Sequence, residues 1–494
     1  MLKPALLIIA GRIVGFAAAF LTPLILVRIF DLETFGTYKQ WFLLYTTLLT
    51  ITQIGMSESL LYFLPRAEAE AGRYVMNSLL FLGAVGTALA LILVLTSGVI
   101  AGWMSNPALA PLIPLLGLYL LFMQASIGLE TVMTARSSFR AAAIAYGVTD
   151  VSRALFLIVP VLLVPSLRSL LYGAVAFSAL RLVYTVRYFW RVFGATFRPD
   201  AACFARQLVY ALPFAAYVLA HIVQENFHQY AVSGLFDAAT FAIYSVGCMQ
   251  IPLVDLVATT VCNVMMVGMT TALHDGRETQ VIDLWHHTVR KLALAFFPLA
   301  CLLLISARDL IVMLFTANYL ASVPIFMAGV TAIFFVVVPV DGLLRVYAKT
   351  HLLLIMNLLR LAVILMLIQW FVTSFGLVGA VLVTVLALAV GKLLGLIAMT
   401  RQWQVGVQHL LPWRTLTAIA ALSITASLPA LAVAYGIHAS APLRLLLVGI
   451  VYFSAYVGMV MGFGVLSVQE RAILARPLEW LSFVRGMRYQ HKIS

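Results

Sequence analysis

The sequence predicts an all-α polytopic membrane protein of about 14 transmembrane helices, built as two parallel six-helix repeats plus two C-terminal helices. Three observations predict this fold: an apolar composition, a series of long apolar segments, and an internal repeat. Of the 494 residues, 63% are hydrophobic and 10% are charged. A soluble protein of this size cannot bury so much apolar surface in one core, so lipid must be the solvent for most of it.

The apolar segments have the length of membrane-spanning helices. A helix needs about 20 apolar residues to cross about 30 Å of hydrocarbon. No alternating ten-residue pattern of barrel strands occurs, so helices are expected. The first segment is too long and too poorly terminated for a cleavable signal peptide, so we expect it to be retained as a span. The predicted spans are residues 4–29, 40–64, 75–101, 108–133, 140–164, 168–190, 208–234, 240–270, 288–306, 320–345, 351–373, 375–400, 413–437 and 441–467.

The chain has a net charge of +13, and the distribution of its basic residues agrees with the predicted spans. The even-numbered connections and the C-terminal tail hold most of the basic residues, and the positive-inside rule then places both termini in the cytoplasm. Nucleic-acid binding is not expected, because topology already explains the basic excess. The even-numbered connections and the tail contain Arg66, Arg73, Arg136, Arg140, Arg187, Arg191, Arg198, Arg206, Arg277, Arg290, Lys291, Arg345, Lys349, Arg401, Arg414, Arg471, Arg476, Arg485, Arg488 and Lys492.

An internal repeat is visible at a shift of about 206 positions. The pattern F-D-x-x-T-F-x-x-Y occurs at residues 30–38 and again at 236–244. A second match at the same shift pairs residues 172–175 with 378–381, both containing G-A-V. Six spans lie within one shift, and an even number preserves orientation in the membrane. The halves are therefore expected to be parallel repeats that can rock about a central cavity, as carriers do.

The repeat defines the predicted domains. We expect a six-helix bundle over 1–200, a second bundle over 201–405, two extra transmembrane helices over 406–467 and a basic tail over 468–494. The tail mixes arginines with apolar residues, which suits either an interfacial helix on an anionic leaflet or a solvated tail with some lipid contact.

Three short motifs resemble a known family. Phe35–Tyr38 is similar to the F-G-x-Y signature of the oligosaccharide flippase (Wzx-type) family. The stretch Gly55–Arg66 resembles an exopolysaccharide-associated branch, and Phe375–Ala380 resembles that family's F-G-L-x-G-A motif. The family belongs to the multidrug/oligosaccharidyl-lipid/polysaccharide (MOP) exporter superfamily. Ala242 departs from the pattern, because the signature prefers glycine there.

The resemblance implies a function. It implies a flippase that moves a polyprenyl-pyrophosphate-linked glycan from the cytoplasmic to the periplasmic leaflet of the bacterial inner membrane for exopolysaccharide or O-antigen synthesis. The expected partners are that substrate, membrane lipid and possible polymerase or export machinery. We expect no enzymatic activity, catalytic residue, cofactor or metal.

The most polar predicted span is 208–234. His221, Gln224, Glu225 and His228 fall on one helical face, since their spacings are three, four and seven. Such a stripe lines a cavity or forms a structural network between helices, and both interpretations stay open. Asp255 is expected at similar depth to His221 and Glu225. Because buried carboxylates and histidines can exchange protons, Glu225 and Asp255 are candidates for ion coupling.

Three basic residues are candidate ligands for the anionic head of the substrate. Arg12 lies within the first predicted span, where its planar fork suits pyrophosphate, although an ion pair with Glu58 is an equal alternative. Arg28 and Lys39 flank the outer end of that span, where snorkelling to the interface is the simpler interpretation.

The remaining membrane charges are expected to brace helices, and four prolines can kink spans. Helical spacing predicts the pairs Asp150 with Arg153 and Asp341 with Arg345. Pro23, Pro213, Pro252 and Pro339 are candidates for kinks that serve gating, although kinked helices are also ordinary in membranes. Glu130, Arg181, Arg360 and Lys392 are further bracing candidates.

Other functions lack their sequence signals. No G-x-x-x-x-G-K-[ST] loop occurs, so the chain has no such phosphate-binding motif. The outer connections are too short for the catalytic loop of a glycosyltransferase or polymerase. The main rival is a multidrug or small-molecule antiporter of the same superfamily, which twelve spans would favour, and a lipid II flippase is the third candidate.

Overall fold

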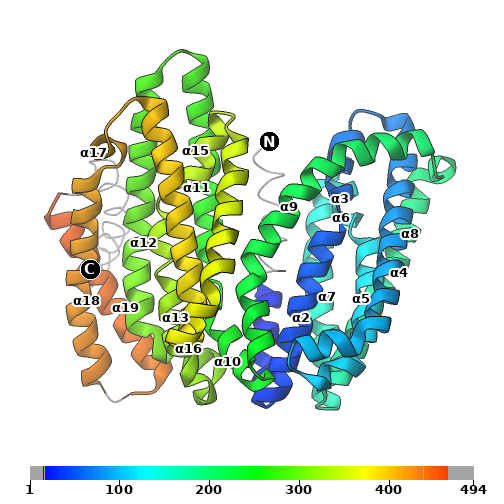
Figure 1. Ribbon diagram of the computed structural model, residues 1–494, viewed down its shortest axis with the longest axis horizontal. Coiled ribbons are helices and arrows are strands. Elements are labelled where there is room, and N and C mark those ends of the chain that lie inside the picture. Colours follow the sequence, from blue (N-terminus) through cyan, green and yellow to red (C-terminus); the bar gives the residue numbers. More distant parts are fainter. Residues whose placement is uncertain (1–14, 16, 438, 465–494) are drawn as a thin grey trace, which may run out of the picture. The chain divides into compact units, whose positions relative to one another are not determined.

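The chain folds into helices in the computed structural model, which describes residue 15, residues 17–437 and residues 439–464 (Figure 1). These described residues contain helices and turns but no strand. The predicted all-α class is therefore confirmed. A helix satisfies its backbone hydrogen bonds internally, which is the condition for crossing hydrocarbon.

The helices form two compact units that are described separately. Unit 1 comprises Met1–Met249, Leu314–Ile325 and Asn357–Ala387, and unit 2 comprises Gln250–Met313, Phe326–Met356 and Leu388–Ser494. The helices of unit 1 are α2 (Leu32–Thr52), α3 (Met56–Phe63), α4 (Ala71–Trp103), α5 (Ile113–Ser126), α6 (Leu129–Ala135), α7 (Phe139–Leu163), α8 (Leu167–Phe193), α9 (Ala201–Leu235) and α10 (Ala238–Gly247). Its 3-10 turns are η1 (Glu68–Glu70), η2 (Pro107–Leu112), η3 (Gly194–Thr196) and η4 (Ala317–Ser322).

Unit 2 holds most of the remaining elements. The long helix α16 (Thr350–Trp403) contributes to both units. The other helices are α11 (Pro252–His274), α12 (Glu278–Phe315), α13 (Val323–Val330), α14 (Ile333–Val336), α15 (Val340–Val346), α17 (Val407–Leu410), α18 (Trp413–Gly436) and α19 (Ala441–Gly462).

Ten helical segments of the described chain are long and apolar enough to cross a membrane, so the count of about fourteen is not confirmed. Of the first predicted span, 4–29, residues 4–14 and 16 lie outside the described residues, and Ala17–Leu26 is a short apolar helix. The predicted spans 40–64 and 208–234 are largely helical, the first as α2 with α3 and the second as part of α9, but neither is among the ten. Helix α16 is counted once, although two predicted spans fall within it.

Helix α16 is too long for a single crossing. Its 54 residues correspond to about 80 Å at about 1.5 Å per residue, against about 30 Å of hydrocarbon. Gly376 interrupts it with φ 60° and ψ −143°, a conformation that glycine adopts most easily. The break lies at the predicted boundary between spans 351–373 and 375–400. The short connection predicted between spans 140–164 and 168–190 is the turn between α7 and α8.

Several spans predicted as continuous are broken in the structure. Span 40–64 divides into α2 and α3 at Gln53–Gly55, where Gly55 has φ 69°. Span 240–270 divides into α10 and α11 before Pro252, and Pro339 precedes α15 within span 320–345. Proline cannot donate a backbone hydrogen bond inside a helix, and Pro252 and Pro339 lie where their predicted spans are broken. Pro23 and Pro213, the other two candidates, lie within the helical segments Ala17–Leu26 and α9. Span 108–133 divides at Ile127–Gly128, a break that the sequence analysis missed.

The repeated motifs adopt the same local structure. Asp31 and Asp237 are N-caps with φ −70° and ψ near 170°, and each side chain accepts a 2.8 Å hydrogen bond from the backbone N–H three residues on. The aspartate and threonine of the F-D-x-x-T-F pattern therefore begin α2 and α10 in the same way. These two helices pack together so closely that a Cβ on Gly36 would overlap the carbonyl oxygen of Ala238.

The second repeated motif marks a close helix crossing in both halves. A Cβ on Gly173 would overlap the carbonyl oxygen of Phe156, and a Cβ on Gly379 would overlap that of Phe371. Small residues allow backbones in membranes to approach in this way. The alanine that follows each glycine is fully buried. The division into bundles over 1–200 and 201–405 stays a prediction, since the compact units follow packing and include both α9 and α10 in unit 1.

Candidate functional site

The polar stripe lies on α9, which begins at a capped turn after the first predicted bundle. Asp200 is the N-cap, and its side chain accepts a 2.9 Å hydrogen bond from the backbone N–H of Cys203. Asn77 of α4 exchanges hydrogen bonds with the backbone of Asp200 at 2.8 and 3.0 Å. The start of α9 is therefore attached to the start of α4 by side chain and backbone together.

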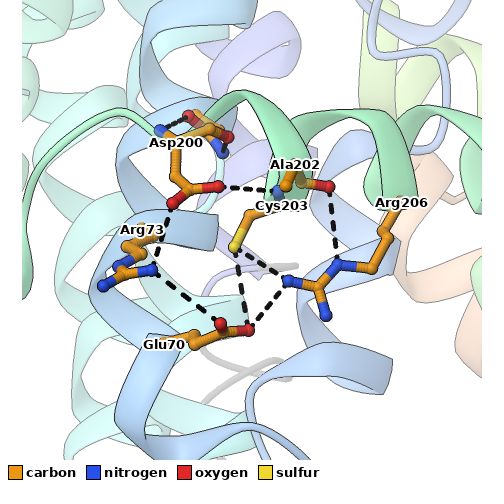
Figure 2. A network of polar contacts seen from close by, with 7 residues as sticks. Glu70, Arg73, Asp200, Ala202, Cys203 and Arg206 are labelled. Carbon is orange, nitrogen blue, oxygen red and sulfur yellow. Dashed lines mark hydrogen bonds and ion pairs between the residues drawn. The ribbon is translucent and has the colours of Figure 1, made fainter.

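Charged residues complete this attachment (Figure 2). Arg73 of α4 lies 3.1 Å from the Asp200 carboxylate, and Arg206 of α9 lies 2.9 Å from Glu70. Hydrogen bonding, led by the backbone N–H of Cys203, lowers the pKa of Asp200 below its usual value. The hydrogen bond to Glu70 raises the pKa of Arg206. The two ion pairs hold the start of α9 against the start of α4.

The far end of α9 is attached to the same bundle. Ser105 donates a 2.7 Å hydrogen bond to the carbonyl of Gly234. Gln40 of α2 is buried and donates to both the hydroxyl of Ser233 and the carbonyl of Met104. Both ends of α9 are thus bound to helices of the first predicted bundle, although its sequence begins the second.

The middle of α9 carries the predicted stripe. The Nε2 atom of His221 lies 3.6 Å from the Glu225 carboxylate, one helical turn away, and their side chains are 45% and 51% exposed. A half-exposed acid–histidine pair on a predicted membrane span is costly where lipid surrounds it and is usual at a polar cavity. The Oε1 atom of Gln224 is buried and has no hydrogen-bond partner among the described residues.

The C-terminal part of the stripe joins α9 to its neighbours. His228 Nδ1 lies 2.6 Å from the hydroxyl of Tyr244 on α10, and Asn226 donates a 2.9 Å hydrogen bond to the Thr47 hydroxyl on α2. The sequence left two interpretations open, a cavity lining and a network between helices. Each of them fits a different part of α9. His228 and Asn226 serve a network between helices, whereas His221 and Glu225 stay half exposed.

The basic candidates have different surroundings. Arg28 donates to the carbonyl oxygens of Leu24 and Leu314, the latter at 2.9 Å. The Nζ atom of Lys39 lies 5.5 Å from the ring centroid of Phe35, one turn earlier on α2. Arg12 and the tail 468–494 lie outside the described residues. Their roles, like those of Arg28 and Lys39, stay predictions.

Asp255 lies in unit 2, in the first turn of α11. Its side chain is exposed within that unit. His221 and Glu225 belong to unit 1, so a joint role with Asp255 stays a prediction.

The structure confirms several bracing pairs. Arg181 lies 2.8 Å from Glu130, and Arg153 lies 3.0 Å from Asp150. Asp341 pairs with Lys392 of α16 at 2.9 Å. The sequence analysis missed this pairing of Asp341 because it considered only Arg345 on the same helix.

The attachments at the two ends of α9 were also missed. Arg73 and Asp200 are 127 positions apart, and Gln40 and Ser233 are 193 apart. No local pattern reports such contacts. The one available signal was the N-cap pattern of Asp200 before an apolar run. Within the described residues, no group of three or more metal-binding side chains lies together.

Comparison with known families identifies the chain. A family model described as polysaccharide biosynthesis protein matches residues 25–324, which include α2, α9 and the stripe. The chain belongs to the polysaccharide biosynthesis protein family. The resemblance predicted from Phe35–Tyr38 and Gly55–Arg66 is therefore confirmed. No curated protein matches this family member significantly.

Solved structures share the fold of this polysaccharide biosynthesis protein. The lipid II flippase MurJ, in an inward-closed conformation, is similar over 97% of this chain and 100% of its own, with 12% identity and a TM-score of 0.71. An inward-facing multidrug resistance MATE family transporter matches over 81% and 96%, with 14% identity and a TM-score of 0.55. A MOP superfamily transporter from Pyrococcus furiosus matches over 80% and 96%, with 13% identity and a TM-score of 0.53. The chain is a multi-pass membrane protein with the MOP transporter fold.

Proposed function

We propose that this protein is a flippase that translocates polyprenyl-pyrophosphate-linked oligosaccharide repeat units by alternating access, for exopolysaccharide or O-antigen synthesis. The observation that carries the proposal is the half-exposed His221–Glu225 pair on α9, which contains the predicted span 208–234 and lies inside the region matched by the polysaccharide family. A sugar presents many hydroxyls, which a stripe of carboxylate, imidazole and amide groups can bind. The lipid tail would remain in the bilayer while the sugar and pyrophosphate cross.

The proposal assigns further roles to the predicted site residues. Arg12, Arg28 and Lys39 would bind the pyrophosphate, because cations suit its charge and arginine adds paired hydrogen bonds. His221, Gln224, Glu225 and His228 would line the glycan path. The protein itself would perform no enzymatic step. Both termini would lie in the cytoplasm and the protein in the bacterial inner membrane, following the distribution of basic connections. Polymerase or export machinery is the proposed downstream partner.

Deletion of the gene tests the substrate class. Undecaprenyl-linked repeat units should accumulate on the inner leaflet, and surface polysaccharide should disappear. Complementation with Glu225→Gln should restore little transport, whereas Glu33→Gln, an exposed acid in the first turn of α2, should restore it fully. Normal polysaccharide in the deletion strain would refute the proposal.

Ion coupling is a second part of the proposal. Glu225 and Asp255 would exchange protons as the cavity alternates, since carboxylates in membrane cavities form proton relays. In vesicles with an imposed pH gradient, wild-type transport should depend on the gradient, and Glu225→Gln with Asp255→Asn should remove that dependence. Transport that responds equally to the gradient in wild type and variant would exclude these two residues as the coupling groups.

Two other functions fit the same fold. The MATE relative favours a multidrug or small-molecule antiporter, and the TM-score of 0.71 favours a lipid II flippase. Extra C-terminal helices favour a flippase, and the match to MurJ covers 97% of the chain against 81% for the MATE transporter. Loss of drug resistance with intact polysaccharide in the deletion strain would favour the antiporter. Loss of peptidoglycan precursor transport would favour the lipid II flippase.

A further inference from the structure

A groove of about 560 Å³ lies between α7 and α8 of unit 1. Its floor contains Leu129 of α6, which is buried. Its rims are apolar side chains that remain 55–66% exposed: Ile144 and Val148 on α7, and Leu180 and Tyr184 on α8. The volume lies within the range of about 300–1,000 Å³ that is typical of ligand pockets.

The groove opens away from the interior of the bundle. Asp150, two residues after Val148, faces the first predicted span, where it lies directly against Gly15. At 3.6 residues per turn, side chains two positions apart point about 160° away from each other. Val148 and the groove are therefore on the opposite side of α7 from this inward contact. On a membrane-spanning bundle, that side is available to lipid.

One end of the groove is closed. The backbones of α7 and α8 meet where Gly173 lies against the carbonyl of Phe156, and the rings of Phe156 and Phe177 are 6.1 Å apart. The lining on α7 extends from Ala141 to Phe156. That length is about 22 Å at 1.5 Å per residue, close to half of the 40–45 Å thickness of a bilayer with its headgroups. The groove thus has the depth of one leaflet.

The other end of the groove is basic. Arg136, Arg140 and Arg187 are exposed near it, and the segments 131–149 and 182–199 contain no acidic residue. Trp190, 65% exposed, lines an adjoining hollow of about 700 Å³ together with Arg187. Tryptophan and arginine at the end of a span are typical of the membrane–water interface.

Two polar side chains at mid-depth, those of Arg181 and Thr149, already have partners. Arg181 lines the groove, but its guanidinium lies 2.8 Å from the buried Glu130 carboxylate. Thr149 donates a 3.1 Å hydrogen bond to the same carboxylate. The lining is otherwise mainly apolar, with Ser152 as a small polar member, so the groove can accept a hydrocarbon chain.

We infer that this groove binds one anionic phospholipid of the leaflet at its basic end, with an acyl chain between α7 and α8 and the phosphate at the arginines. An anionic headgroup complements the arginines, whereas a zwitterionic one brings no net charge. The depth of one leaflet suits a phospholipid chain that stops at the closed end. This site is separate from the stripe of α9, and the inference does not depend on the transported substrate.

Native mass spectrometry of the full-length protein in detergent tests the inference. Phosphatidylglycerol or phosphatidylcholine is added, and bound lipid is counted at increasing activation energy. Wild type should retain one phosphatidylglycerol more firmly than phosphatidylcholine. Val148→Trp should fill the groove, and Arg140→Gln with Arg187→Gln should remove charge, and each change should weaken phosphatidylglycerol binding by about tenfold or more.

The matched control is Arg401→Gln with Arg414→Gln, which removes the same charge from exposed positions of the chain elsewhere. It should leave the retained lipid unchanged. If Val148→Trp does not fold, the arginine variants still decide the matter. Equal retention by all variants, equal retention of the two phospholipids, or replacement of phosphatidylglycerol by polyprenyl phosphate would each overturn the inference. Because no transport is measured, failure here leaves the proposed flippase function untouched.

Discussion

Two ion pairs join helices in comparable parts of the two halves, and their surroundings differ. Glu130 and Arg181 are 51 positions apart, and so are Asp341 and Lys392. The distances are 2.8 and 2.9 Å. In the first pair the side chains are 6% and 8% exposed, whereas in the second Asp341 is 42% exposed and Lys392 11%.

Hydrogen bonds from neighbouring side chains also enclose the first pair. Arg181 also donates to the hydroxyl of Ser126, and Glu130 accepts from Thr149, so the first pair is enclosed by its own network. A buried charge without such partners is strongly destabilising. The exposed carboxylate of Asp341 has the alternative of hydration. The first pair is therefore a fixed brace, while the second can exchange its partner at low cost.

The largest expected effect separates these two pairs directly. Arg181→Leu should lower the free energy of unfolding by about 3–5 kcal/mol, because it leaves Glu130 buried and unpaired. Denaturant titration of the purified protein in detergent would measure this change. The double variant Glu130→Leu with Arg181→Leu should recover much of the loss, since no charge then remains buried. A loss from Arg181→Leu no larger than that from Lys392→Leu would remove the distinction.

Substitutions at the two glycines of the second repeated motif test whether the helix crossings in the two halves are equivalent. Gly173→Val and Gly379→Val should each cost about 1–3 kcal/mol, because both glycines lie against a carbonyl oxygen of the neighbouring helical segment. Gly98→Val is the control, since a Cβ at Gly98 meets no atom. Similar thermal destabilisation at both positions is expected, and a tolerated change at either one would show that the crossings are not equivalent.

The N-caps of α2 and α10 should also behave alike. Asp31→Ala and Asp237→Ala should each reduce stability by about 1 kcal/mol. Hydrogen bonds, led by the side chains of Thr34 and Thr240, lower the pKa of both carboxyls from 3.8. Their contribution is therefore complete above about pH 4 and is lost as the pH falls through the lowered folded-state values. Unfolding measured from pH 6 to pH 3 should show wild type approaching the variants only below pH 4.

The smallest effect is expected at the open ion pair. Asp341→Asn should cost less stability than Glu130→Gln, because the Asp341 carboxylate is 42% exposed and that of Glu130 is 6% exposed. The measurement is the same denaturant titration, with Glu130→Gln as the matched change in the first pair. A cost at Asp341 as large as that at Glu130 would mean that both pairs are fixed braces.

The sequence predicted the features that repeat or recur along the chain. Composition, span length and the F-D-x-x-T-F pattern led to the all-α class and to the matching N-caps. Spacing along one helix also placed His221 and Glu225 within 3.6 Å of each other. These predictions succeeded because each depends on near neighbours in sequence.

The missed features depend on distant neighbours. Periodicity placed His228 and Glu225 on the same helical face and could not distinguish their roles. In the structure, Tyr244 of another helix contacts His228. The pair Asp341–Lys392 and the cluster around Glu70 likewise join separate helices. The break at Gly128 was missed because its backbone stays near helical values, with φ −73° and ψ −4°.

The attachment of α9 has a consequence for how the two halves were joined. By sequence, the boundary between repeats lies before α9, yet hydrogen bonds at both its ends bind α9 to the first bundle. The boundary between the repeats in the sequence and the first boundary between the compact units, which follows α10, are therefore different. A chain cut after α9 and α10, and produced as two fragments, would leave the polar stripe with the first fragment.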